Sequence, residues 1–320
     1  MGLTVYGGGG KPEEEKTVTA GTSVIEVSPS SGKVMKKVTV NPTPSQEKTI
    51  KDPIETTIII PDEGKLLSKV TINIFNPALV TWAGGTDEEI VKMVQLADEG
   101  KINLSDYWAV GDIRTVQLSA MSATGVGESH AAQQVDLVLM HAGGYDLNAA
   151  VASGRTKCSF VVGLKDSLAE AGYMNSSDTN RGSWNGSKRR TWCNNVFRNA
   201  IPSTLRAIFK QFKTVTAETY NGLTNQTSVD YFALPAEREI FGAKNSCNQT
   251  EYNALFQFDY YKTASNRVKK LGKTGSASFW WERSPFYSSS AGFCFVYSGG
   301  SAGGSYYASY TDGLAPFGCI

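Results

Sequence analysis

The sequence changes character at Asn76-Pro77. All six tryptophans and all five cysteines lie beyond this point. The residues before it are rich in Lys, Glu, Thr and Pro, and their short apolar runs at 57–60 and 70–74 are typical of strands bounded by turns. Because Trp and Cys are mostly buried, the sequence predicts two regions. Small β modules come first, and a larger globular domain follows from residue 81.

An internal repeat lies within the first region. Residues 29–41 align with residues 61–73 at an offset of 32, with seven identities in thirteen positions. Each unit offers a Pro-x-x-Gly turn followed by a strand, which is too little to bury a core alone. We therefore predict a β-repeat attachment region over residues 17–76, made of two units and stabilised by other copies of the chain. Residues 1–16, with their Gly run, are expected to form a flexible segment.

Residues 81–320 combine helix and strand patterns, so we expect one mixed α+β domain. Residues 86–101 predict a helix, because Thr86 suits the N-cap, acidic residues fill the first turn and apolar residues recur at helical spacing. The other predicted elements are strands within 103–121 and 133–142, a helix over 192–212 that breaks or restarts at Pro202, a strand and short helix over 230–242, and aromatic-rich strands in the last 45 residues.

Composition and charge exclude several classes of protein. The 320 residues are 41% hydrophobic, enough for a core, and the net charge of +1 gives no field that attracts nucleic acid or an anionic membrane. The sequence has no run of 18 apolar residues and no signal-peptide pattern, so we expect synthesis in the cytoplasm and no membrane insertion. The five cysteines are widely spaced without a CxxC pair, which predicts free, mostly buried thiols.

The sequence contains no clear pattern of catalytic or metal-binding residues. The two histidines, His130 and His141, lack metal-ligand spacing, and Ser129 beside His130 lacks a third orienting group. The basic run at 188–190 is short and predicts a solvated helix face rather than a nucleic-acid site. An enzyme acting on surface polymers is disfavoured because no paired carboxylates stand in a recognisable setting. We therefore predict no catalytic residue, no metal site, no cofactor and no enzymatic activity.

Residues 286–312 use almost only Ser, Gly, Ala, Tyr and Phe. They follow FWWERSP (279–285), which predicts a strand ended by Pro, with Glu282 and Arg283 tying the next loop by charge-assisted hydrogen bonds. A flexible linker is one interpretation, but linkers rarely hold Tyr and Phe at this density. The composition favours a contact surface, because Tyr and Phe supply rigid area while Ser and Gly adapt.

A set of motifs runs through the larger domain in order: YWAVGD (107–112), RGSWNGSKRRTWCNNVF (181–197), IPSTLRAIFKQF (201–212), DYFALPAEREIFG (230–242), FWWERSP (279–285) and GLAPFGCI (313–320). Together they resemble the C-type-lectin-like fold of the formylglycine-generating-enzyme kind, in the branch found in phage tail and surface proteins of gut bacteria. The resemblance covers residues 81–320. Residues 17–75 are similar to short β repeats of phage tail and baseplate proteins.

The resemblance implies a compact fold whose C-terminal strands and loops display a variable ligand-binding face near residues 286–312. Some members are the variable proteins of diversity-generating retroelements, in which adenine-directed mutagenesis diversifies such a face, and this stretch uses the residues that the process produces. Two activities of related branches are not implied. Nothing places Cys294 and Cys319 as a copper-binding pair, and Trp184-Asn185-Gly186 departs from the calcium-dependent sugar-binding motif.

The sequence therefore predicts a phage receptor-binding protein at the tail tip or fibre of the virion. Its C-terminal face would contact a bacterial surface protein or glycan, and its N-terminal repeats would bind other tail proteins. Avidity favours a homo-oligomer, with a trimer as the first expectation. The alternative is a structural decoration or baseplate protein whose face contacts other virion subunits. Phe293, Cys294 and Val296 are expected to face inward. The predicted ligand contacts are Tyr287, Ser288, Tyr297, Ser301, Ser305, Tyr306, Tyr307, Ser309 and Tyr310.

Overall fold

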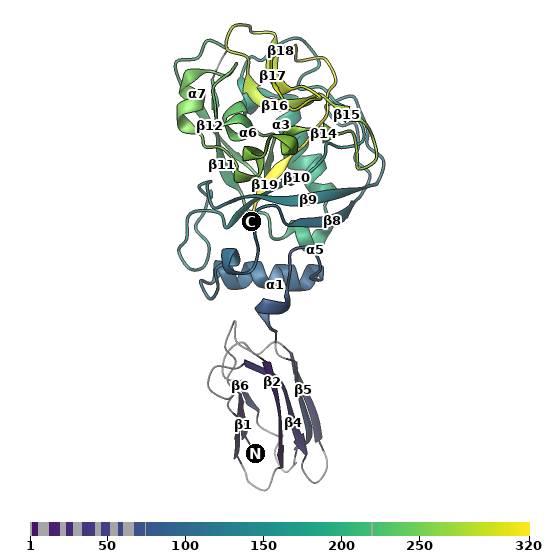
Figure 1. The fold of residues 1–320 in the computed structure, drawn as a ribbon, viewed down its shortest axis with the longest axis vertical. Helices are drawn as coiled ribbons and strands as arrows, with labels where there is room; N and C mark the ends of the chain where they lie inside the picture. Colours follow the sequence, from purple (N-terminus) through teal and green to yellow (C-terminus); the bar gives the residue numbers. More distant parts are fainter. Residues whose placement is uncertain are drawn as a thin grey trace. The chain divides into compact units, whose positions relative to one another are not determined.

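The computed structural model describes residues 75–218 and 220–320 in full. Within residues 1–74 it describes the backbone of seven strands: β1 (Gly2–Val5), β2 (Glu13–Thr19), β3 (Val24–Val27), β4 (Val34–Asn41), β5 (Gln46–Lys51), β6 (Thr57–Ile59) and β7 (Leu67–Asn73). The chain divides into two compact units, Met1–Thr81 and Trp82–Ile320 (Figure 1). Each unit is described by itself.

The two sequence repeats occupy matching places in one four-stranded sheet of the first unit. The strand order is β2-β4-β7-β5, with β2 parallel to β4 and β5 parallel to β7. Lys37 of the first repeat pairs with Glu15, and Lys69 of the second repeat pairs with Glu47. These two pairs are 32 residues apart at both positions (47 − 15 and 69 − 37), which is the offset of the sequence repeat. The repeated sequence therefore produces a repeated strand pairing.

Strands β4 and β7 join the two repeats by antiparallel pairing. Thr39 pairs with Thr71, its own equivalent in the second repeat, so a local two-fold relation connects the units. A three-stranded sheet of order β3-β1-β6 accompanies them, and the short helix η1 (Pro77–Leu79) follows. Strand β1 and the start of β2 lie within the segment 1–16 that the sequence predicts to be flexible, whereas its Gly run at 7–10 lies outside the described residues.

A five-stranded sheet forms the centre of the second unit. Its order is β13-β19-β10-β9-β8, and neighbouring strands run antiparallel. The last strand of the chain, β19, lies between β10 and β13 (yellow in Figure 1), and both β10 and β19 are wholly buried. The C-terminus is thus part of the core. The strands are β8 (Ile113–Leu118), β9 (Gln133–Ala142), β10 (Phe160–Leu164), β13 (Phe232–Ala233) and β19 (Phe317–Cys319).

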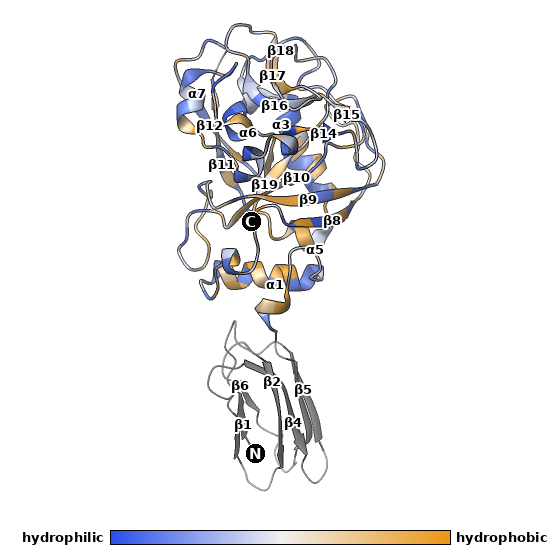
Figure 2. Cartoon of the chain, viewed as in Figure 1, coloured by the Kyte–Doolittle hydropathy of each residue, from blue (hydrophilic) through white to orange (hydrophobic). Residues whose placement is uncertain are grey.

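Helix α1 (Asp87–Asp98) confirms the first helix prediction. Thr86 Oγ1 accepts a hydrogen bond from the backbone N–H of Glu89, and the Glu89 carboxylate accepts one from the N–H of Thr86, which makes a capping box. One side of the helix buries Ile90, Met93 and other apolar residues, and Figure 2 shows hydrophobic and hydrophilic residues side by side along it. The amphipathic pattern in the sequence therefore corresponds to a helix packed on one side.

The second predicted helix begins earlier and ends earlier than residues 192–212. Its segments are α2 (Ser183–Gly186), α3 (Lys188–Trp192), a π-helical turn η3 (Cys193–Phe197), α4 (Arg198–Ala200) and α5 (Ser203–Arg206). The helix stops at Ile201 and restarts after Pro202, which confirms the predicted break. It does not reach residue 212, because Phe212 begins a strand whose pairing requires extended backbone.

The prediction of a solvated helix face at residues 188–190 is wrong for Arg189, whereas Lys188 is exposed and Arg190 is half-buried. Arg189 is fully buried, with its Nη2 2.6 Å from Glu128 and its guanidinium donating to the carbonyl of Tyr173. Arg190 donates from Nε to Asp230 at 2.7 Å. A basic run at the start of a helix is typical of a solvent-exposed face. Here, however, acidic residues from distant segments pair with the two arginines.

The remaining elements confirm a mixed α+β unit. The prediction over residues 230–242 is confirmed, since strand β13 is followed by helix α6, which ends at Gly242 in the left-handed conformation. The other elements are β11 (Phe212–Ala217), β12 (Asn225–Asp230), α6 (Glu237–Phe241), α7 (Gln249–Ala254), α8 (Asp259–Lys262), η2 (Leu104–Asp106), η4 (Ala264–Arg267), β14 (Lys269–Lys270) and β15 (Ala277–Ser278). All five cysteines are free and buried, as the sequence predicts.

A second antiparallel sheet is formed by β16 (Trp280–Pro285), β17 (Gly292–Val296) and β18 (Ala302–Tyr307), in that order. In Figure 1, β17 and β18 lie at the end of the unit opposite to α1. Both β16 and β17 are wholly buried, whereas β18 alternates between buried, half-buried and exposed positions. Three of the nine predicted contact residues, Ser305, Tyr306 and Tyr307, lie on β18, and the other six lie in the loops and turns next to the strands of this sheet.

Candidate functional site

Buried aromatic rings form a floor on one side of the second sheet. Trp281 and Phe295 are fully or almost fully buried and pair across β16 and β17. Phe279, just before β16, packs on Phe295 with ring centroids 5.4 Å apart. The Trp281 indole N–H donates to the carbonyl of Gly172 at 2.7 Å, so its polar atom is satisfied although it is buried. Residues resting on this floor therefore have a rigid support.

A bulge in β18 brings two residues onto the floor. Gly303 pairs with Phe295 and Tyr306 pairs with Phe293, so β18 has one more residue than β17 between these pairs. A Cβ atom at Gly303 would lie 2.4 Å from the Phe295 ring. Tyr306 packs on the same Phe295 ring at 5.0 Å and on Trp281 at 5.8 Å. Glycine is therefore required at position 303, where β18 passes over the Phe295 ring. Tyr306 packs on the same ring from the next part of the strand.

Four tyrosines, Tyr297, Tyr306, Tyr307 and Tyr310, form what we call the tyrosine face. Tyr297 and Tyr306 cover the floor, and Tyr310 packs on Tyr306 at 5.0 Å and on Tyr307 at 5.3 Å. Tyr297, Tyr307 and Tyr310 are 41%, 49% and 47% exposed, although each contacts other rings. A contiguous aromatic surface is thus open to solvent and held by its own ring contacts.

The predicted contact residues all lie at or near the surface. Phe293, Cys294 and Val296 are fully buried, which confirms the inward direction predicted for them. Tyr306 and Ser309 are half-buried. The exposed members of the set are Tyr287, Ser288, Tyr297, Ser301, Ser305, Tyr307 and Tyr310. Their role as ligand contacts stays a prediction. The sequence does not single out Phe279, Trp281 and Phe295 as the support of the face, because every residue of β16 and β17 is buried and no alternation of inward and outward residues marks these rings.

The loop before β17 is fixed by hydrogen bonds to a buried asparagine. Asn180 Nδ2 donates to the carbonyls of Ser289 and Gly292, and its backbone N–H donates to the carbonyl of Ser290 at 2.7 Å. The N–H of Tyr287 donates to the carbonyl of Ser246. These bonds come from segments far away in sequence. The linker interpretation is therefore wrong: the stretch folds as two strands and bonded turns.

The turn after β18 is fixed in a similar way. Ser309 donates from its N–H at 3.2 Å and from Oγ at 2.5 Å to Asp178 Oδ1, and the N–H of Tyr310 donates to the carbonyl of Tyr307. Asp312, two residues later, is 6% exposed and its Oδ2 has no hydrogen-bond partner among the described residues. Burial raises the pKa of Asp312 to about 7. Ser309 thus holds the turn that presents Tyr307 and Tyr310.

Tyr287 has different neighbours from the tyrosine face. Its ring packs on Phe286 with centroids 5.2 Å apart, and the Lys244 ammonium lies 5.3 Å from the ring centroid. Ser288, the next residue, is exposed. We treat Tyr287 and Ser288 as a separate patch next to the tyrosine face. Lys244 forms a cationic border to this patch, because the Tyr287 ring contacts Phe286 and Lys244.

The interpretation of Glu282 and Arg283 as a tie for the following loop is wrong. Arg283 is fully buried and forms a bidentate pair with Glu239 of α6, both N–O distances being 2.6 Å. Glu282 is also fully buried, but neither carboxylate oxygen has a hydrogen-bond partner among the described residues. Tertiary packing buries this part of the strand, so neither charge reaches the loop.

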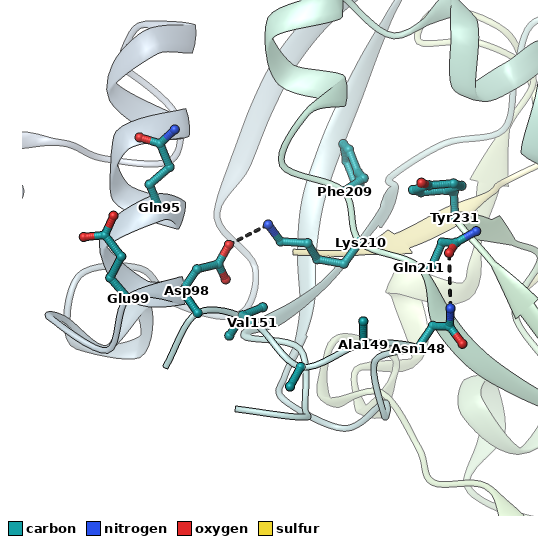
Figure 3. Close-up of a pocket in the computed structure, with 12 residues that line it drawn as sticks. Gln95, Asp98, Glu99, Asn148, Ala149, Val151, Phe209, Lys210, Gln211 and Tyr231 are labelled. Atoms are coloured by element: carbon teal, nitrogen blue, oxygen red, sulfur yellow. Dashed lines mark hydrogen bonds and ion pairs between the residues drawn. The ribbon is translucent and has the colours of Figure 1, made fainter. Parts of the chain in front are cut away.

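A pocket of about 590 Å³ beside α1 is a second candidate site (Figure 3). Phe209 and Tyr231 form part of its wall. Asp98 Oδ2 lies 2.5 Å from Lys210 Nζ, and Asp98 Oδ1 lies 2.9 Å from Arg155 Nη2. Because Asp98 already has two cationic partners, and Lys210 is used in one of these pairs, the main charges of the wall are satisfied within the protein. The pocket therefore offers weaker support for function than the tyrosine face.

Comparison with known proteins identifies one domain family. The family described as a domain of unknown function (DUF6273) matches residues 161–320, which is half of the chain. No curated protein and no solved structure matches the sequence or the fold. In the described residues, we find no helix long and apolar enough to span a membrane. The matched half runs from β10 to the end of β19 and contains the whole tyrosine face.

Proposed function

Because this chain belongs to the DUF6273 family, whose description names no activity, we propose its function from its own exposed residues. We propose that it is a phage receptor-binding protein whose tyrosine face contacts a ligand on the bacterial surface. The observation that carries this proposal is a solvent-open set of tyrosines supported by buried rings. Rings held in place before binding lose little conformational entropy on contact, which favours affinity.

The arrangement of the second unit supports the finer proposal of a C-type-lectin-like fold. Its C-terminal strand β19 lies inside the five-stranded sheet, and a separate small sheet projects the contact residues from the other end of the unit. Proteins that recognise ligands in this way combine a fixed scaffold with an adaptable surface. Residues 286–312 combine both, since Phe295 and Gly303 are buried while Tyr307 and Tyr310 are exposed.

Diversification by a retroelement is part of this proposal. It requires a second copy of the 3′ end of the gene near the gene itself, differing from it almost only at adenines, together with a reverse transcriptase. We expect natural variants to differ at Tyr297, Tyr307 and Tyr310 and to retain Phe295 and Gly303, because a side chain at Gly303 would clash with the ring. Sequencing the neighbouring DNA tests this. If both the copy and the reverse transcriptase are missing, the diversification claim is contradicted while receptor binding is not.

The proposal has two further parts: the N-terminal unit binds other tail proteins, and the chain assembles as a homo-oligomer. Several copies of a shallow face can raise the apparent affinity by about 10²–10⁴-fold when all can bind at once. We propose a trimer in the tail tip or fibre of a virion. Mass measurement of the purified full chain, and of the chain within particles, tests this, and a monomer in both contradicts it.

The central test is adsorption of the labelled full chain to cells of the bacterium that carries the gene or its phage. We expect the triple variant Tyr306→Ala, Tyr307→Ala, Tyr310→Ala to lose most adsorption. Leu223→Ala is the matched control, because Leu223 is a large apolar residue that is 89% exposed outside the face. Tyr→Phe changes at the same three positions separate ring contact from hydroxyl bonding. Equal adsorption of the triple variant and the unchanged chain contradicts the proposal, and assembly defects with normal adsorption would favour virion decoration instead.

A further inference from the structure

A cluster of acidic residues lies buried on the other side of strand β17 from the ring floor. Cys294 stands between Phe293 and Phe295, so its side chain points away from theirs. Its sulfur and one carboxylate oxygen each of Glu237 and Glu282 lie within 4.8 Å of one another. All three residues are fully buried. Three elements therefore meet here: α6 supplies Glu237, β16 supplies Glu282 and β17 supplies Cys294.

Glu237 is held in one orientation by backbone hydrogen bonds. Its oxygens accept from the N–H groups of Asn245 at 2.7 Å, Ser246 at 2.6 Å and Cys247 at 3.0 Å. Three such bonds satisfy the oxygens of this buried side chain. They also fix its orientation, because the donors come from one turn of the chain. Glu237 is thus a buried, preoriented oxygen donor with three backbone hydrogen bonds.

Glu282 is the unusual member of the cluster. It is fully buried, and both of its oxygens lack a hydrogen-bond partner among the described residues. Burial raises the pKa of Glu282 well above its usual range, and the neighbouring carboxylates, Glu237 first among them, raise it further. Burying an unpaired carboxyl is costly. Arg283, the adjacent cation, is occupied by its bidentate pair with Glu239.

We propose that Glu237, Glu282 and Cys294 form a buried binding site for a divalent cation, and that zinc is the ion this donor set fits best. A thiolate selects zinc over magnesium or calcium, and carboxylate oxygens are also accepted zinc ligands. Donor atoms around a tetrahedral zinc lie about 3.5 Å apart, since the bonds are about 2.0–2.3 Å long. The three donor atoms are within 4.8 Å of one another, so small side-chain rotations bring them to that spacing.

A water molecule supplies the fourth zinc ligand, or the thiolate of Cys247 does so after the thiol has lost its proton. Cys247 is fully buried, and its thiol hydrogen-bonds to Glu237. Zinc binding displaces the protons of Glu282 and Cys294, because only the carboxylate and the thiolate are ligands. The three deprotonated ligands carry three negative charges, and the ion offsets two of them. It also ties β16, β17 and α6 together directly beneath the sheet that carries the tyrosine face.

Metal analysis of the full chain tests this site. The protein is purified without a histidine tag, dialysed against a weak chelator and measured by plasma mass spectrometry. We expect about one zinc per chain, and Glu282→Gln and Cys294→Ser should each weaken zinc binding more than tenfold, the scale on which even residues that only orient ligands act. Cys193→Ser is the matched control, because Cys193 is also a fully buried thiol and its neighbours are Arg189 and Asp230.

Replacement of zinc by cobalt provides a readout that a folding defect alone does not reproduce. The unchanged chain and Cys193→Ser should have a thiolate-to-cobalt absorption band, and Cys294→Ser should lack the contribution of that thiolate. Because Gln has almost the same shape as Glu, we expect the Glu282→Gln variant to fold, and its thermal transition checks that it does. The proposal is overturned if the unchanged chain holds no metal and its melting temperature does not rise with added zinc. It is also overturned if Glu282→Gln binds zinc as tightly as the unchanged chain, because Glu282 would then be a neutral buried acid.

Discussion

The tyrosine face and the acidic cluster lie on opposite sides of strand β17, the face on Phe295 and the cluster at Cys294, yet their side chains are held by different forces. On the face, Tyr306, Tyr307 and Tyr310 contact other rings and keep one side toward solvent. In the cluster, Glu237 and Glu282 are removed from water entirely. Replacing an exposed ring lowers the stability of the fold only slightly. Removing one partner of a buried charge lowers it strongly, because the charge is then left without its partner. Strand β17 therefore separates a replaceable surface from a core that tolerates little change.

The largest loss of stability is expected for Arg283→Met. This change leaves the Glu239 carboxylate buried without its bidentate partner, and it removes the donor to the carbonyl of Leu234. We expect the free energy of unfolding to fall by about 3–5 kcal/mol. Urea unfolding followed by tryptophan fluorescence measures this in the second unit, because all six tryptophans lie there. Arg181→Met, at an exposed arginine, is the control and should change little. Equal effects of the two changes would contradict the dependence of the buried pair on its partner.

A smaller loss is expected for Gly303→Val, which tests the floor of the tyrosine face. The new Cβ would lie 2.4 Å from the Phe295 ring, so the strand or the ring must move. Overpacking of this kind costs about 1–3 kcal/mol. Gly299→Val is the matched control, since a Cβ there meets no atom within 4 Å. A thermal melt compares the two variants, and an unchanged melting temperature for Gly303→Val would show that the floor adapts.

The smallest effect on stability is expected at the top of the face. Tyr307→Ser removes a ring that is 49% exposed and packs on Tyr310. We expect the free energy of unfolding to change by less than about 1 kcal/mol, because the lost ring pair is near the surface. The same urea titration measures it. A loss as large as that of Arg283→Met would mean that the tyrosines hold the fold together, and the contrast between the two regions would disappear.

Local sequence signals predicted several elements well. Helix α1 has its N-cap at Thr86 as predicted, and residues 133–142 form strand β9. Pro202 marks the break in the second helix. These elements follow from short-range chemistry: a side chain that caps a helix, an apolar run of strand length, or a ring that removes a backbone donor. The repeat offset of 32 likewise recurs in the strand pairing of the first unit.

Charged residues were harder to place from the sequence. Arg189 and Arg283 are fully buried because carboxylates from distant segments reach them. The partners, Glu128 and Glu239, are tens of residues away from their arginines in the sequence. No local sequence pattern therefore predicts either pair. The three donors of the acidic cluster are separated in the same way, at positions 237, 282 and 294. A search for metal motifs at fixed spacing cannot find such a set.

By itself, the sequence determined the division near residue 80, the mixed α+β class of the larger region and the surface chemistry of residues 286–312. Each depends on composition or on neighbours within a few positions. Only the tertiary structure decided that Gly303 crosses the Phe295 ring, that Arg283 pairs with Glu239 and that Glu282 lies beside Glu237 and Cys294. These contacts join residues far apart along the chain, and which of them form depends on how the sheets and helices pack around one core.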